Sequence, residues 1–165
     1  IILGGITLVR SISDLDIIKL PSPKCLEVII IRPNIEIKTS DSRSVVKKKV
    51  KIEKMVQQSA NLGAFISSLY SEDFDLMSRS IVDEVVEPDR SILIPEFESI
   101  KKISTESGAL SFGISGSGPS MFALSNNSET SKIVLSNVCN HLDKVNIDYD
   151  SFISKVNPKG IKILD

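Results

Sequence analysis

A short turn rich in glycine and serine is the first feature of the sequence that could do chemistry. The stretch FGISGSGPSMFAL places Ser115-Gly116-Ser117-Gly118-Pro119 between two apolar runs. Glycines supply positive φ and proline fixes one torsion, so one interpretation is a plain hairpin turn. The other is an anion-binding concavity built from the N–H groups of Gly116, Ser117 and Gly118, with the hydroxyls of Ser115 and Ser117 as further donors. The stretch alone does not separate the two.

Two phosphate-loop patterns fail on this turn. From Gly113 the spacing matches a Walker loop, but Pro119 occupies the lysine position and a strand-like run follows instead of a helix. A GxGxxG dinucleotide motif would start at Gly116, yet Met121 stands at its third glycine. The sequence therefore predicts neither kind of nucleotide-binding loop.

Cysteine, histidine and acidic residues provide no second chemical centre. Cys25 and Cys139 are far apart in the sequence and His141 is the only histidine, so a Cys/His zinc site cannot be assembled. We interpret Asp73 and Asp75 as cap and dipole partners at a helix start rather than as metal ligands. The chain is predicted to carry no metal ligand and no catalytic side chain. Its sparse cysteines fit a reducing, cytoplasmic compartment best.

Composition argues against several classes of function. The 165 residues include 20 basic and 21 acidic side chains, a net charge of −1 that gives no footprint for nucleic acid. No apolar run approaches the ~20 residues of a membrane helix, so no membrane partner is expected. The opening residues 1–5 do not resemble a signal peptide, and we expect the chain to be a piece of something longer. The length fits one domain with one core.

Apolar spacing predicts the elements that must position the turn. Strands are expected where β-branched residues run together or alternate, and helices where apolar residues recur every three to four positions. For the first half these rules predict strands over 5–10 and 26–32, a loop over 14–24 because of its two prolines, an extended stretch over 34–38, a helix start capped within 39–42 and a helix over 51–70.

The second half is predicted to alternate helices with strands. Helical spacing continues over 75–86 until Pro88 interrupts it, and Pro95 is expected in the first turn of a helix over 96–106. Two antiparallel strands flank the turn, and Asn126 with Glu129 resembles a capping box that opens another helix. Strands over 147–156 and 161–164 complete the order β-β-α-α-α-β-β-α-β-β. This order is typical of an α+β fold with helices packed on an antiparallel sheet.

Three stretches resemble the GHMP kinases, the superfamily of galactokinase, homoserine kinase, mevalonate kinase and phosphomevalonate kinase. The run FGISGSGPSMFAL resembles their third conserved motif and is most similar to the form found in homoserine kinases. LGGITLVR, residues 3–10, resembles the segment after the N-terminal domain, and PNIEIKTSDSR, residues 33–43, resembles a substrate-binding segment. The similarity spans essentially the whole chain. It implies that residues 1–165 fold as a GHMP kinase C-terminal domain, a ferredoxin-like α+β sandwich.

One feature of that superfamily is missing. Its phosphate loop has the form PxxxGLGSSAA and belongs to the N-terminal domain, and nothing like it occurs in this sequence. The resemblance therefore implies that ATP and Mg²⁺ bind mainly to an N-terminal domain of the same enzyme. It also implies that the present chain alone is inactive.

The resemblance assigns Thr39, Arg43 and Arg90 to the binding of L-homoserine. Thr39 and Arg43 are four residues apart and can share a helix face. Two guanidinium groups converging on one small zwitterion make chemical sense, because arginine binds a carboxylate bidentately. For either arginine alone, a solvated surface position is the plainer alternative. The turn is then expected to line the cleft and support the phosphate loop of the missing half through Ser115, Gly116, Ser117 and Gly118.

The implied activity is the ATP-dependent phosphorylation of L-homoserine to O-phospho-L-homoserine, a step of threonine biosynthesis. Two alternatives stay open: another small-molecule kinase of the superfamily, or a ferredoxin-like module that binds an amino acid for regulation without catalysis. Fold alone does not decide between them. The oligomeric state, with a homodimer as one option, also stays open.

Overall fold

An antiparallel sheet of four strands forms the centre of the molecule. The structure is a computed structural model that describes residues 3–161. The strands lie side by side in the order β4-β5-β3-β6, and every neighbouring pair is antiparallel. Their bounds are Glu27–Pro33 for β3, Ser111–Ile114 for β4, Met121–Ser125 for β5 and Tyr149–Lys155 for β6.

Two helices connect these strands across one face of the sheet. Helix α5 (Phe97–Glu106) lies between β3 and β4 in the sequence, and α6 (Ser128–Lys144) lies between β5 and β6. The succession β3-α5-β4-β5-α6-β6 with this strand order is ferredoxin-like. The α+β fold class predicted from the sequence is therefore confirmed, with a long insertion between β3 and α5.

Alternate strand residues point toward these two helices. Ile29 and Ile31 of β3 pair in register with Ala123 and Met121 of β5, and all four side chains are fully buried. The helices complete this first core with Phe97, Ile100, Val134, Val138 and Leu142. The strands are thereby held rigidly from one side.

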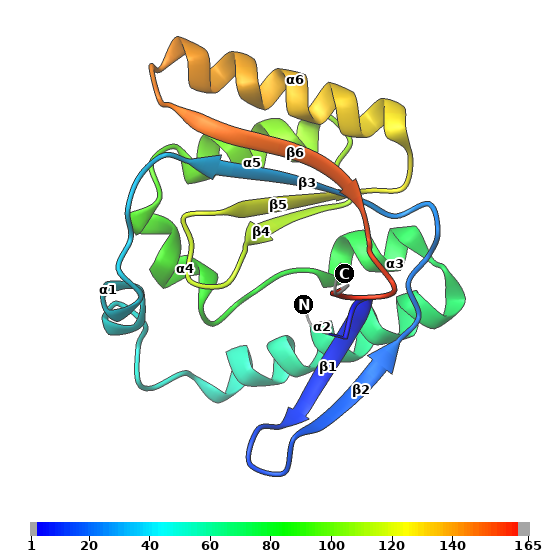
Figure 1. Cartoon of the computed structure of the whole chain (residues 1–165). Helices are drawn as coiled ribbons and strands as arrows, with labels where there is room; N and C mark the ends of the chain where they lie inside the picture. Colours follow the sequence, from blue (N-terminus) through cyan, green and yellow to red (C-terminus); the bar gives the residue numbers. More distant parts are fainter. Residues whose placement is uncertain (1–2, 162–165) are drawn as a thin grey trace.

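The opposite face is covered by α2 (Ile52–Ser71), α3 (Phe74–Ser80) and a separate hairpin of β1 (Ile6–Ser11) and β2 (Asp16–Leu20). A second core joins these elements to the sheet through Leu20, Leu26, Leu69, Met77 and Leu124. Figure 1 shows the arrangement, with α5 and α6 on one side of the sheet and α2, α3 and the hairpin on the other. Within the described residues, no helix is both long and apolar enough to cross a membrane.

Three short helices complete the insertion between β3 and α5. They are α1 (Thr39–Ser44), α4 (Glu87–Arg90) and the 3₁₀ helix η1 (Ser91–Leu93). In Figure 1, α1 and α4 lie at the end of the sheet where the connection between β4 and β5 turns back. The two arginines and the turn that the sequence predicts to be functional thus come from one end of the molecule.

The loop predicted over 14–24 was wrong in its first half. Asp16–Leu20 is strand β2, which pairs with β1 from Ile6 opposite Leu20 to Ser11 opposite Asp16. Both prolines, Pro21 and Pro23, follow the strand, so they end it rather than prevent it.

The helix predicted over 75–86 is shorter than expected. Helix α3 ends at Ser80, and residues 81–86 form neither helix nor strand. The Asp83 carboxylate accepts hydrogen bonds from the N–H groups of Val85, Val86 and Glu87 at 2.8–3.2 Å. Because this side chain satisfies the backbone donors, the segment folds into a turn instead of continuing the helix.

Helix starts also differ from the prediction by a few residues. No side chain caps α1, which follows Lys38. Helix α5 begins after Glu96, so Pro95 precedes its first turn. Asn127, rather than Asn126, caps α6.

Two further predicted extended segments remain, and the structure tests only the first. Residues 34–38 have no ladder partner among the described residues. The strand predicted over 161–164 lies outside the described residues, apart from Ile161. The other predicted strands and helices are found where the apolar spacing places them.

Candidate functional site

The glycine-serine turn connects β4 to β5 as a closed loop. The N–H of Ser115 donates to the carbonyl oxygen of Ser120 at 2.8 Å, and the N–H of Gly118 donates to that of Ser115 at 3.2 Å. Gly116 and Gly118 have φ values of +64° and +79°, and the Gly118–Pro119 peptide bond is cis. Positive φ at both positions explains why the turn uses glycine.

Only part of the predicted anion concavity is available in this turn. The N–H of Gly118 is engaged with Ser115. Those of Gly116 and Ser117 have no acceptor among residues 3–161. A Cβ at Gly116 would meet no atom within 4 Å, whereas one at Gly118 would lie 3.1 Å from Cδ1 of Ile94. Gly116 therefore faces open space, and Gly118 packs against the domain.

Helix α1 is fastened to the turn by one buried hydroxyl. Ser42 is fully buried, and its Oγ donates to the carbonyl oxygen of Ser117 at 2.8 Å. Thr39 and Arg43 lie on the same short helix and are exposed. Both predicted substrate residues therefore lie on a helix that contacts the turn, and both are exposed.

Arg90 joins α1 and the turn to α4. Its Nε donates to the carbonyl oxygen of Ser42 at 3.1 Å, and its Nη1 donates to that of Gly116 at 3.0 Å. Arg90 ends α4, so three segments far apart in the sequence meet at one guanidinium group. We call these three residues, Ser42, Arg90 and Gly116, the junction.

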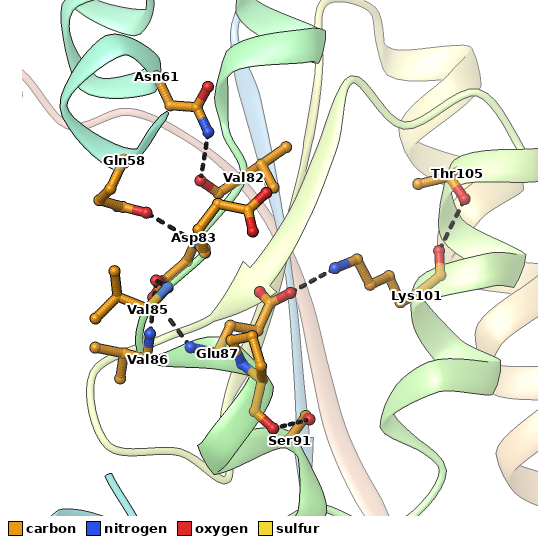
Figure 2. Close-up of polar contacts among 12 residues, drawn as sticks. Gln58, Asn61, Val82, Asp83, Val85, Val86, Glu87, Ser91, Lys101 and Thr105 are labelled. Carbon is orange, nitrogen blue, oxygen red and sulfur yellow. Dashed lines mark hydrogen bonds and ion pairs between the residues drawn. The ribbon is translucent and has the colours of Figure 1, made fainter. Parts of the chain in front are cut away.

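Helix α4 has only one turn, and side chains around it hold it in place. The carboxylate of Asp83 accepts the N–H of Glu87, the first residue of α4, at 3.2 Å (Figure 2). Asp89 accepts the N–H of Lys47 at 2.9 Å and the Lys47 ammonium at 3.1 Å, which ties α4 to the segment after α1. The hydrogen bond from the Lys47 N–H lowers the pKa of Asp89.

Glu87 fastens the other side of α4 to the core helices. It is 8% exposed and forms an ion pair with Lys101 of α5. Figure 2 shows the carboxylate and the ammonium pointing toward one another between the two helices. Burial raises the pKa of Glu87, and the Lys101 ammonium opposes that rise.

A cavity of about 210 Å³ opens between α4, the segment before it and the strands beside the turn. Its lining includes Glu87, Arg90, Gly113 and Gly116. Its volume lies below the ~300–1,000 Å³ of pockets for drug-sized ligands, so it suits a small metabolite.

The described residues offer no metal-binding cluster. No group of three or more His, Cys, Asp or Glu side chains in residues 3–161 could hold a metal ion. Asp73 caps α3 by accepting the N–H of Leu76 at 2.8 Å, as the sequence predicts. Nε2 of His141 in α6 lies 2.9 Å from Oε2 of Glu96, the residue before α5. Within residues 3–161, neither His141 nor Glu96 is hydrogen bonded to a junction residue.

Sequence reasoning missed the residues that support Arg90. Ser42, Asp83, Glu87 and Lys101 are common polar types with no motif of their own, and their roles follow only from contacts between distant segments. One signal was available at Glu87, an acidic residue directly before a proline at a helix start.

Comparison with known families agrees with this fold. The family model described as "GHMP kinases C terminal" matches residues 52–144, more than half of the chain. The chain belongs to the GHMP kinase C-terminal family.

Within that family, close relatives are homoserine kinases. The chain is 39% identical over 165 residues to homoserine kinase of Chlorobium phaeobacteroides, covering 99% of this chain and 52% of the relative. The crystal structure of homoserine kinase from Cytophaga hutchinsonii has a TM-score of 0.93 and 41% identity, covering 96% of this chain and 50% of that one. The chain thus spans about half the length of the relatives it matches.

A more distant structure shares the fold alone. Phosphomevalonate kinase of Streptococcus pneumoniae, solved with phosphomevalonate and AMPPNP, has a TM-score of 0.64 at 11% identity, covering 86% of this chain and 43% of that one. The ferredoxin-like arrangement is therefore shared with this distant structure as well.

Proposed function

We propose that this chain is the C-terminal, substrate-binding half of a homoserine kinase. The observation that carries the proposal is the likeness to the Cytophaga hutchinsonii enzyme, a TM-score of 0.93 with 41% identity across 96% of this chain. The reaction transfers the γ-phosphoryl group of ATP to the hydroxyl oxygen of L-homoserine. That oxygen loses its proton, and the products are ADP and O-phospho-L-homoserine.

Arg43 and Arg90 are proposed to hold the carboxylate of homoserine, and Thr39 its amino-acid end. Arg90 is partly buried and already oriented by two carbonyl oxygens of the junction. A guanidinium has five donors, so Arg90 can keep a backbone contact while it binds a carboxylate. Arg43 is exposed on the neighbouring helix and supplies the second positive charge.

The remaining parts of the site belong to the other half of the protein in this proposal. ATP and Mg²⁺ bind mainly to an N-terminal domain, because the phosphate loop of the form PxxxGLGSSAA that the superfamily carries there does not occur in residues 1–165. The turn, with Ser115, Gly116, Ser117 and Gly118, lines the cleft and supports the phosphate loop of that domain. Phosphoryl transfer depends mostly on positioning and on stabilising charge, which suits a site divided between two halves.

The cellular setting follows from the same proposal. A homoserine kinase acts in threonine biosynthesis, and we place it in the cytoplasm. The two cysteines, Cys25 and Cys139, are free thiols in the structure, which fits a reducing compartment.

A substrate panel tests the proposal. The full-length protein that carries this chain is assayed for ADP release with L-homoserine, mevalonate and phosphomevalonate at equal concentrations. We expect turnover with L-homoserine alone. Turnover with mevalonate or phosphomevalonate instead would assign the chain to a sibling kinase, and binding of an amino acid without any ADP release would assign it to regulation.

The isolated chain provides a second test. Residues 1–165 offer no phosphate loop backed by a lysine or a helix N-terminus. We expect no ATP-dependent phosphorylation of L-homoserine by the chain alone, with circular dichroism verifying that it is folded. Measurable phosphorylation would show that the nucleotide site does not need a second half.

A further inference from the structure

We propose that the buried ion pair between Glu87 and Lys101 is a positioning device that sets the guanidinium of Arg90 for substrate binding. The inference rests on the proposed function for its substrate, L-homoserine. Neither Glu87 nor Lys101 needs to touch that substrate, because both act through α4.

A helix as short as α4 cannot hold its own direction. Glu87–Arg90 is a single turn, and an isolated turn lacks the cooperativity that stabilises longer helices. Its orientation must therefore come from contacts with neighbouring elements. Glu87 begins this turn and Arg90 ends it, so a shift at the first residue moves the last.

Lys101, the ion-pair partner of Glu87, lies on a helix that is anchored in the core. It lies on α5 beside Ile100, which is fully buried in the first core, and its ammonium lies 5.9 Å from the ring centre of Phe97. Phe97 is itself 3% exposed and packs against Phe112 of β4, with ring centres 5.4 Å apart. The backbone from which Lys101 extends is thereby held by the core of the domain.

Glu87 also packs closely against strand β4. A Cβ built on Gly113 of β4 would lie 3.3 Å from Oε2 of Glu87 and 3.1 Å from the ring of Phe122. The carboxylate thus sits directly on the strand that leads into the turn. The ion pair connects α5 to α4, and the carboxylate of Glu87 lies next to β4 at Gly113. Figure 2 shows Glu87 and Lys101 facing one another.

Breaking the pair should loosen Arg90 without unfolding the domain. Removing Lys101 leaves the buried carboxylate of Glu87 without its partner, and a buried unpaired charge is unfavourable. Glu87 can avoid this cost only by taking up a proton or by moving toward water. Either response changes where α4 lies against the junction. Because misplacement of a substrate-positioning group by ~1 Å can cost ~100-fold, the homoserine site should respond.

The test compares K101M, E87Q and the double variant in the full-length enzyme. Each single change is expected to raise KM for L-homoserine about tenfold or more, with KM for ATP nearly unchanged. The double variant should resemble the worse single variant, because residues that act as one unit are not additive. K101R keeps the cation and should restore most of the affinity. K102M serves as control, since Lys102 is exposed on the same helix and pairs only loosely with Glu106 at 3.8 Å.

A readout independent of catalysis separates this proposal from the proposed function. Trypsin cleaves after arginine, and a loosened α4 exposes the bond between Arg90 and Ser91. We expect faster cleavage at that bond in K101M and E87Q than in the wild type, K101R or K102M. Faster cleavage in an enzyme inactive on homoserine would overturn the proposed function alone. Unchanged cleavage and unchanged homoserine KM in folded K101M and E87Q would overturn the positioning role, as would equal losses of homoserine and ATP affinity.

Discussion

Nη1 of Arg90 lies 3.0 Å from the carbonyl oxygen of Gly116, so a side chain from the insertion is hydrogen bonded to the turn between β4 and β5. The same guanidinium reaches α1 through the carbonyl oxygen of Ser42. Two regions that the sequence marks separately, the arginine segments and the glycine-serine turn, are therefore in contact. If Arg90 binds the substrate as proposed, this contact couples substrate binding to the turn.

Arg90→Ala should weaken homoserine binding strongly. In the full-length protein we expect a loss of about 2–5 kcal/mol, roughly 30- to 4,000-fold in KM for L-homoserine, as for losing one partner of a desolvated charge pair. KM for ATP should change little. The melting temperature should also fall, because two backbone carbonyls lose their donor.

Arg79→Ala is the matched control for Arg90. Arg79 lies exposed in the last turn of α3 and belongs to none of the contacts at the junction. Its removal should leave both KM values and the melting temperature unchanged. Wild-type homoserine KM in Arg90→Ala would show that Arg90 has only a structural role.

Arg43→Ala should separate binding from stability. Arg43 is exposed, so its loss should change the free energy of unfolding by no more than ~0.5 kcal/mol. Homoserine KM should nevertheless rise by a factor of ten or more, on the order of the ~1.5–3 kcal/mol of a hydrogen bond to a charged group. Steady-state kinetics and thermal melts on one preparation measure both quantities. If Arg43 is only a solvated surface residue, both the homoserine KM and the melting temperature of Arg43→Ala will equal those of the wild type.

The two glycines of the turn should respond differently to alanine. Gly118→Ala places a methyl group 3.1 Å from Ile94 at a positive φ, so we expect a stability loss of about 2–4 kcal/mol from overpacking and strain together. Gly116→Ala meets open space and should cost about 1 kcal/mol, from backbone strain alone.

The kcat per folded molecule of Gly116→Ala then shows whether Gly116 has a functional role. If the turn supports the phosphate loop of the other half, Gly116→Ala should lose about 100-fold in kcat while remaining folded. The measurement is kcat normalised to the folded fraction from a thermal melt. Near-normal kcat would return the turn to the plain hairpin interpretation.

Glu27 should make folding sensitive to acid. Its buried carboxylate accepts a hydrogen bond from the hydroxyl of Ser128, with the oxygens 2.5 Å apart. This hydrogen bond lowers the pKa of Glu27 below its ordinary value of 4.5. A lowered carboxyl pKa stabilises the fold above pH 4.5, and this contribution disappears as the pH falls through the folded-state value. Chemical denaturation across pH 3–7 should therefore show E27Q less stable than the wild type at neutral pH, with the difference shrinking in acid. E53Q, at the exposed start of α2, should follow the wild type; a constant gap for E27Q would contradict the assignment.

The sequence was informative where a pattern is local, and less so where contacts join distant segments. Ile29, Ile31, Met121 and Ala123 alternate as strand residues facing a core must, so the sheet could be predicted. The strand Asp16–Leu20 was missed because prolines that end a strand were taken to exclude one. The contact between Lys101 and Glu87 joins residues 14 positions apart, and no periodic pattern in the sequence predicts it.

In the candidate site, too, local features could be inferred from the sequence and contacts between distant segments could not. The turn carries its glycines in one run, so its positive φ values could be inferred from sequence. The hydrogen bond from Arg90 to Gly116 could not be inferred, because the two residues are 26 positions apart, with η1, α5 and β4 between them. The resemblance to a known family, rather than spacing, singled out Arg43 and Arg90 beforehand.

The central claim is that Arg43 and Arg90 recognise the carboxylate of an amino-acid substrate, and one comparison tests it most directly. Full-length wild type, Arg43→Ala and Arg90→Ala are assayed with L-homoserine and with 3-amino-1-propanol, which has the same hydroxyl and amine but no carboxylate. We predict that the wild type strongly prefers L-homoserine in kcat/KM and that each variant loses about 2 kcal/mol or more of that preference, roughly 30-fold, with little change for the amino alcohol. An undiminished preference for L-homoserine in both variants would contradict the account.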